Sequence, residues 1–63
     1  MTKTDYIKIV LNKIYADKKT LQRIEEDLNE RIELAMESDP FLDIVEEMGE
    51  PDELAKEFME NQI

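Results

Sequence analysis

Apolar residues recur every three or four positions in four successive segments of this chain, and the first segment covers residues 5–15. At about 100° per residue, its apolar side chains fall within one half of a helix surface. These are Tyr6, Ile7, Val10, Leu11, Ile14 and Tyr15. The preceding residue, Thr4, can cap the first turn through its hydroxyl. The pattern therefore predicts a helix over residues 5–15, with Ile9 outside its apolar arc.

The second segment carries the longest apolar stripe, which follows the suitable N-cap Asp17. The stripe continues for about five turns through Leu21, Ile24, Leu28, Ile32, Ala35 and Met36. We expect a helix over residues 18–37, about 30 Å long at 1.5 Å per residue. Leu34 lies off this stripe, as Ile9 lies off the first one. Single exposed apolar residues are ordinary, so both residues are candidate partner contacts rather than established ones.

Ser38-Asp39-Pro40 predicts the end of one helix and the start of another over residues 40–48. Asp39 would serve as N-cap, and Pro40 would occupy the first helical position, where a missing N–H costs nothing. The apolar face of this third helix would consist of Phe41, Leu42, Ile44, Val45 and Met48. Gly49, the only glycine, stands where a helix commonly ends in the left-handed conformation.

Pro51 opens a fourth predicted helix over residues 51–60, with acidic residues in its first turn, where the helix dipole favours them. Its apolar stripe consists of Leu54, Ala55, Phe58 and Met59. No segment alternates apolar and polar residues as a strand does. We therefore expect an all-α fold, a compact bundle of four helices whose last two are short and joined through Gly49-Glu50-Pro51. A chain of 63 residues builds one core, so residues 1–63 should form a single domain.

Charge divides the chain into two unlike parts. Of its 8 basic and 17 acidic residues, positions 1–23 hold six basic and two acidic ones, and positions 24–63 hold two and 15. We expect the basic part to fold against the acidic helices and to lower their mutual repulsion. The alternative is a surface of one sign that is offered to a partner of the opposite sign.

The residue types exclude the commonest catalytic and metal-binding sites. The chain has neither Cys nor His, which removes thiolate and imidazole chemistry. No segment matches a calcium-binding loop, and paired-carboxylate catalysis needs a sheltered cleft that so small a bundle has little room to form. We therefore expect no catalytic residue, no metal, no cofactor and no enzymatic activity.

Location and partner class also follow from composition. The longest apolar runs have three residues, against roughly 20 for a membrane-spanning helix. The first residues lack the features of a secretory signal, so we expect a cytoplasmic chain whose residues 1–63 do not enter a membrane. With a net charge of −9, the chain should repel nucleic acid rather than bind it.

Residues 48–58, MGEPDELAKEF, resemble the LGDPEEIAKEI ending of the HAAS domain. This small helical module precedes the transmembrane helices of many bacterial membrane proteins and is often encoded beside PadR-like transcriptional regulators. A first helix containing residues 5–8 and a long acidic helix containing residues 27–32 follow the family's order. Glu50 stands where the family usually has Asp, and Asp39-Pro40 replaces a Ser/Lys-type linker. The positions expected to fix the layout are Asp39, Pro40, Gly49, Pro51, Leu54 and Ala55.

This resemblance implies a non-catalytic regulatory or protein-interaction domain, similar to the N-terminal signalling module of a bacterial membrane protein. Its partner would be a protein, either a transcription regulator or the remainder of the membrane protein. The contact would use the acidic surface of the last three helices together with Ile9 and Leu34. The alternative is a free-standing acidic adaptor or nucleic-acid mimic that binds a basic protein. Self-association as a homo-oligomer would help so thin a core.

Overall fold

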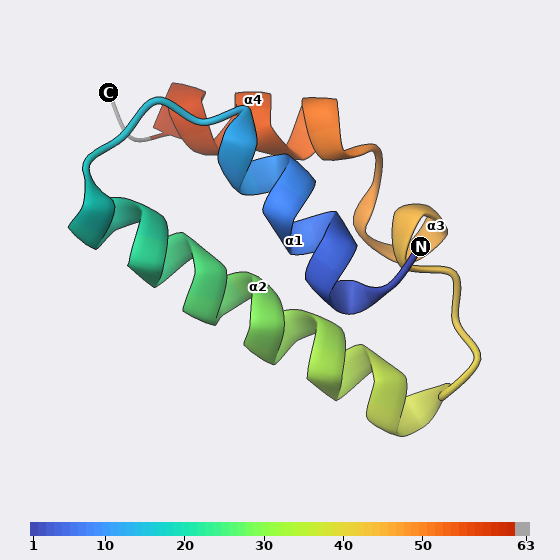
Figure 1. Cartoon of the computed structure of the whole chain (residues 1–63). Helices are drawn as coiled ribbons and strands as arrows, with labels where there is room; N and C mark the ends of the chain where they lie inside the picture. The colour runs from blue at the N-terminus through green and yellow to red at the C-terminus, as the bar shows by residue number, and fades with distance from the viewer. Residues whose placement is uncertain (62–63) are drawn as a thin grey trace.

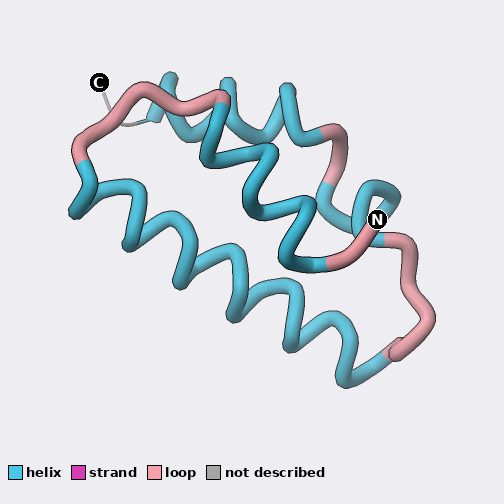
Figure 2. Tube along the Cα trace, in the orientation of Figure 1, coloured by secondary structure: helices cyan, strands magenta, loops and turns pink. Residues whose placement is uncertain are grey.

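The computed structural model describes residues 1–61, which contain helices and no strand (Figure 2). Three helices have ten or more residues: α1 (Lys3–Asn12), α2 (Lys18–Ser38) and α4 (Pro51–Asn61). The remaining helix, α3 (Ile44–Met48), has only five (Figure 1). The all-helical prediction is confirmed. The expected bundle of four comparable helices is wrong in part. Three helices form the body, and the third predicted helix is reduced to little more than one turn.

The first helix, α1, lies at the centre of the molecule. It packs against α2, α4 and α3, and Figure 1 shows it between α2 and α4. Residues 13–17 reverse the chain direction, so α1 and α2 run antiparallel. The resulting body is compact and elongated, measuring 33 × 19 × 18 Å along its principal axes, with its longest helix along one side.

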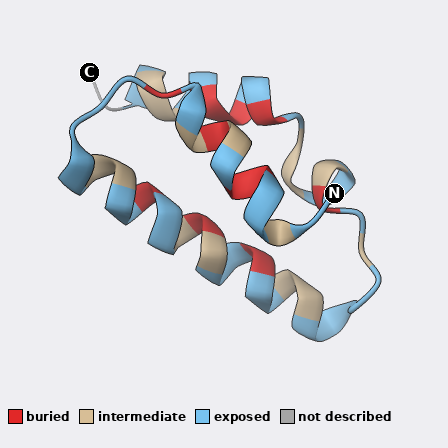
Figure 3. Cartoon of the chain, viewed as in Figure 1, coloured by how far each residue is buried: buried red, intermediate tan, exposed pale blue. Residues whose placement is uncertain are grey.

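The core gathers the sides of the helices that face α1, as the buried positions in Figure 3 show. Tyr6 and Val10 of α1 meet the α2 stripe, in which Leu28 and Ile32 are fully enclosed. The complete set of buried apolar residues is Tyr6, Ile7, Val10, Ile14, Ile24, Leu28, Ile32, Ile44, Leu54 and Ala55. No charged or polar side chain is buried among the described residues. The stripe predicted for the second helix therefore does supply the core from its middle turns.

The ends of α1 differ from the prediction. Thr2, rather than Thr4, is the N-cap, and its Oγ1 accepts a hydrogen bond from the Asp5 N–H at 3.1 Å. The helix ends at Asn12 instead of residue 15 because the chain must turn before Asp17, whose extended backbone starts α2. The Asp17 carboxylate accepts from the Thr20 N–H at 2.8 Å, as an N-cap should.

The start of the predicted third helix is also wrong. Asp39 does not cap a helix over residues 40–48: its N–H donates to the Ala35 carbonyl at 3.1 Å, which ends α2. Its carboxylate accepts from the Phe41 N–H at 3.1 Å and so closes a turn that contains Pro40. Asp43 is the N-cap instead, with its carboxylate accepting from the Val45 N–H at 3.0 Å.

The junction between α3 and α4 has the expected layout. Gly49 adopts φ +93° and ψ 176°, a region open almost only to glycine. Its N–H donates to the Val45 carbonyl at 2.8 Å and ends α3. Pro51 is the first residue of α4, and both Leu54 and Ala55 are buried one turn later. A glycine and a proline thus turn the chain so that α4 returns along α1.

Candidate interaction surface

The two residues predicted as partner contacts, Ile9 and Leu34, do not form one surface. Leu34 is 57% exposed on α2, whereas Ile9 is half-buried on α1. The Lys3 Nζ atom lies 2.8 Å from Glu33 Oε1, which sets the antiparallel register of these helices. In that register Ile9 is level with about residue 27, so Leu34 lies about seven residues, or about 10 Å, farther along α2.

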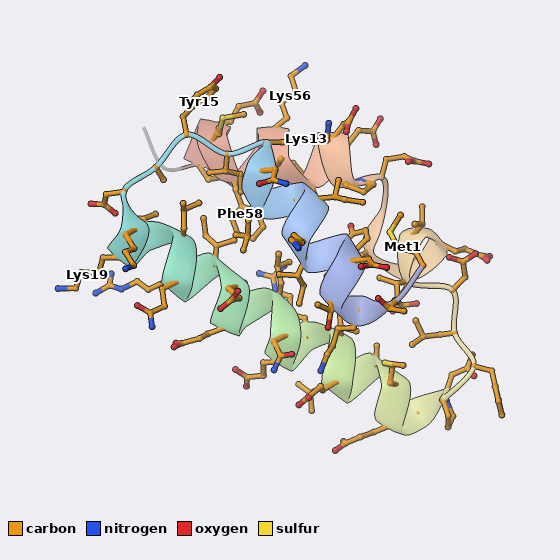
Figure 4. The ribbon with its side chains drawn as sticks, viewed as in Figure 1. Met1, Lys13, Tyr15, Lys19, Lys56 and Phe58 are labelled. Atoms are coloured by element: carbon orange, nitrogen blue, oxygen red, sulfur yellow. The ribbon has the colours of Figure 1, made fainter. Side chains whose placement is uncertain are left out.

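Two aromatic residues that the sequence pattern assigns to apolar faces are almost fully exposed. Tyr15 and Phe41 are each 95% exposed. Tyr15 lies in the connection between α1 and α2 and points away from the body (Figure 4), and Phe41 lies in the connection between α2 and α3. The two aromatics therefore mark opposite ends of α2, and Phe41 shares its end with Leu34.

A signal for the exposure of Phe41 is present in the sequence. Asp43 is followed three positions later by Glu46, the spacing of a capping box, in which an N-cap residue and an acidic residue bracket the first turn. Asp43 accepts from the Glu46 N–H at 3.4 Å as well as from Val45. A helix start at this second capping position leaves Phe41 in the preceding connection.

Ion pairs join the basic first part of the chain to the acidic helices. Lys3 pairs with Glu33 of α2, and Lys13 Nζ lies 2.9 Å from Asp52 Oδ1 of α4. A third pair links Asp27 and Arg31 within α2 at 3.1 Å. The expectation that the two parts fold against each other is therefore confirmed.

Most of the negative charge remains at the surface without a close cation. Three of the 17 acidic residues form ion pairs within the described part of the chain. Exposed acidic residues follow one another along α2, α3 and α4. They are Glu25, Glu26, Glu30, Glu37, Glu46, Glu47, Glu53, Glu57 and Glu60. Glu30 and Glu37 of this acidic surface are the fourth residue before and the third residue after the exposed Leu34.

The titration shifts follow from contacts that hold the fold together. The hydrogen bond and charge of Lys3 lower the pKa of Glu33, and the hydrogen bonds with Thr20 lower the pKa of Asp17. Burial raises the pKa of the Tyr6 hydroxyl, and the nearby Glu50 carboxylate raises it further. The Tyr6 hydroxyl donates to the Gly49 carbonyl at 2.7 Å. Asp17 therefore caps α2, Glu33 links α2 to α1, and Tyr6 links α1 to the α3–α4 junction.

An open groove of about 540 Å³ runs between α1 and α2. Ile7 and Leu11 lie at its base, with Lys8 on the α1 side and Glu25 and Glu26 on the α2 side. The groove is shallow and open to solvent. Its walls carry opposite charges, which distinguishes it from the uniformly acidic outer surface.

Residues 1–61 contain no gathered group of metal-ligating side chains and no membrane-spanning helix. No three metal-ligating side chains there are gathered so that they could hold an ion. Every helix in that range is too short or too polar to cross a lipid bilayer.

Comparison with protein-family models, curated proteins and solved structures finds no match to this chain. The resemblance to the HAAS domain therefore stays a prediction, which rests on residues 48–58 and on the order of the helices.

Proposed function

We propose that this chain is a non-catalytic protein-interaction domain with a regulatory role, the cytoplasmic N-terminal module of a bacterial membrane protein. The observation that carries the proposal is the pairing of exposed apolar side chains with an acidic surround. Leu34 and Phe41 project at the C-terminal end of α2, 57% and 95% exposed. Aromatic side chains such as Phe41 are enriched in protein interfaces, and a few central contacts supply most of the binding energy.

The charges around this end of α2 indicate the chemistry of the partner. Glu30 and Glu37 are exposed on the turns of α2 next to Leu34, and Asp39 directly precedes the turn that holds Phe41. A complementary partner would offer an apolar pocket with a basic rim. The resemblance favours a PadR-like transcription regulator, and regulators of transcription carry basic surfaces for DNA.

The test uses the purified chain and a PadR-like regulator, the partner class that the resemblance implies. Fluorescence anisotropy of labelled chain would give the Kd, and Leu34→Asp and Phe41→Asp should each weaken binding about tenfold or more, the usual size for a central contact. Tyr15→Asp is the matched control, because Tyr15 has the same exposure at the other end of α2. Equal affinities for all variants, with unchanged circular dichroism, would show that this surface is not the contact.

A second candidate function, an acidic mimic of nucleic acid, is favoured by the row of exposed carboxylates on α2. Glu26, Glu30 and Glu37 are exposed on the same helix without an ion-pair partner in the described residues. Such a mimic would lose affinity steeply as salt rises from about 50 to about 200 mM, since charge neutralisation supplies its binding energy. Duplex DNA would displace the mimic from its basic partner protein. Leu34→Asp would have little effect on the affinity for that partner.

A further inference from the structure

The groove between α1 and α2 has walls of opposite charge that leave their charges unpaired. Lys8 lines the α1 side, and Glu25 and Glu26 line the α2 side. None of the three forms an ion pair with a described residue. Between the walls, Ile7 and the half-buried Leu11 form a narrow apolar base. The groove therefore presents one basic ridge, one acidic ridge and an apolar strip between them.

The axial register brings the two ridges to the same level. Lys3 is level with Glu33 through their ion pair, and α1 and α2 run antiparallel side by side (Figure 1). With the same rise per residue in both helices, Lys8 is level with about residue 28. It therefore lies within one helical turn of Glu26 along the groove.

We infer that this groove binds the same groove of a second copy of the chain, with the two-fold axis running along the groove. A rotation about that axis places α1 of each copy over α2 of the other and preserves the axial levels. Lys8 of each copy then faces Glu25 and Glu26 of the other copy, so the complementary contact forms twice. A two-fold axis across the helices would place Lys8 against Lys8, which is repulsive.

The properties of the chain favour a second copy over another occupant. An isologous contact brings the same patch of both copies together, so its charges attract only where that patch carries both signs. The groove does so on a molecule whose net charge is −9. Pairing would cover the half-buried Leu11 and would stack α1 and α2 of the two copies as a four-helix bundle. The contact is small, so we expect a weak, reversible dimer.

This inference concerns a different surface from the proposed function. At about 100° per residue, Leu34 is about 180° around α2 from Glu25 and about 80° from Glu26, and it lies about 12 Å farther along the helix than Glu26. A partner at Leu34 and a second copy at the groove can therefore be tested separately. Failure of either experiment leaves the other conclusion standing.

Sedimentation equilibrium of the chain tests the inference directly. Between about 10 µM and about 1 mM, the range of weak associations, the mean mass should rise from 7.5 kDa towards twice that value. Lys8→Glu, and separately the double variant Glu25→Lys/Glu26→Lys, should raise the dimer Kd about tenfold or more by setting like charges against each other. The double variant also lowers the net negative charge, so a loss of dimer cannot come from general repulsion.

Mixing the two groove variants provides the decisive measurement. Each variant alone sets like charges against each other, but their heterodimer restores attraction at both contacts, so an equimolar mixture should dimerise as the wild type does. The matched controls on α4 are Lys56→Glu and Glu53→Lys/Glu57→Lys, which change charge equally outside the groove. A wild-type monomer at about 1 mM, variants that behave as the controls do, or a mixture that stays monomeric would each overturn the inference.

Discussion

Tyr6 of α1 and Phe41 of the α2–α3 connection are aromatic side chains of similar size in opposite environments. Tyr6 is fully enclosed, and Phe41 is 95% exposed. The difference lies in the neighbours of each segment. Helix α1 has α2 on one side and α4 on the other, whereas residues 39–42 form a turn that is fixed by the Asp39 carboxylate. For these two residues, burial is therefore decided by the packing of the segment that carries the side chain and not by the hydrophobicity of the side chain.

One hydrogen bond joins the core to the α3–α4 junction. The Tyr6 hydroxyl donates to the Gly49 carbonyl at 2.7 Å across 43 residues of sequence. The apolar ring of Tyr6 fills the core while its polar end satisfies a backbone carbonyl at the edge. This contact fixes where the chain turns into α4, and α4 in turn covers α1.

The largest effect should come from truncating a side chain that faces α1. Leu28→Ala should lower the free energy of unfolding by about 3 kcal/mol, because Leu28 is fully buried and its removal leaves a cavity. Phe41→Ala removes a larger side chain but should change stability by no more than about 0.5 kcal/mol, as at other surface sites. Urea denaturation followed by circular dichroism measures both. Similar losses of unfolding free energy in the two variants would show that Phe41 contributes to stability as a core residue does.

The next largest effect should arise at the junction. Gly49→Ala should cost about 2 kcal/mol, since a side chain strains the backbone at φ +93°. An added Cβ would meet nothing within 4 Å, so the cost comes from the backbone alone. A synthetic chain with D-alanine at position 49 is the control, because D-residues favour positive φ. If L- and D-alanine proved equally destabilising, a cause other than backbone conformation would be needed.

Tyr6→Phe should lower stability by about 1.5 kcal/mol, because the Gly49 carbonyl loses its donor while the ring remains packed. The effect should also depend on pH. The pKa of Tyr6 is raised in the fold, so Tyr6 resists ionisation more there than in the unfolded chain. Its contribution is complete below the unfolded pKa of about 10 and is lost as the pH rises through the folded value.

Alkaline denaturation of the two tyrosine variants separates this effect from general charge repulsion. Stability of Tyr6→Phe should fall less above pH about 10 than stability of the wild type. Tyr15→Phe is the matched control, because Tyr15 is almost fully exposed and its variant should follow the wild type. Parallel curves of stability against pH for the wild type and Tyr6→Phe would show that folding does not change the ionisation of the Tyr6 hydroxyl.

The smallest effects concern the two aspartates that compete to start the third helix. Asp43→Ala should cost about 1 kcal/mol as the loss of an N-cap. Asp39→Ala should cost about 0.5 kcal/mol, since its side chain makes one hydrogen bond in an exposed turn. Thermal unfolding of both variants gives the order. A larger loss of stability for Asp39→Ala would indicate that Asp39 is the N-cap and that the helix begins at residue 40.

Long periodic stripes were sufficient to predict α2 and α4. Leu28 and Ile32 belong to the longest apolar stripe of the chain. Gly49 and Pro51 mark the junction because a positive φ suits glycine and the first helical position suits proline. Helix ends were harder to predict, because Thr2 and Thr4, and likewise two aspartates near residue 40, each suit a cap locally. Tertiary packing decides between equivalent caps, and its effect cannot be recognised from the few residues around each helix end.

The candidate interaction surface could be predicted only in part. The exposure of Leu34 follows from its angle on a helix that packs with one face. Ile9 is half-buried because α1 packs on two sides, which widens its apolar arc beyond a single stripe. The exposure of Tyr15 depends on where α1 ends, and the apolar pattern places that end too late. The exposure of Phe41 depends on whether Asp39 or Asp43 caps α3, and the spacing of Asp43 and Glu46 is the sequence signal for Asp43.

The central place of α1 has a consequence for biosynthesis. Among the helices described, the ribosome makes α1 before the segments that enclose it, and α4 emerges last. Tyr6 cannot reach its carbonyl acceptor, nor Ala55 its place beside α1, until almost the whole domain has left the exit tunnel. The face of α1 that meets α4 therefore stays uncovered after α2 has been made, until α4 follows.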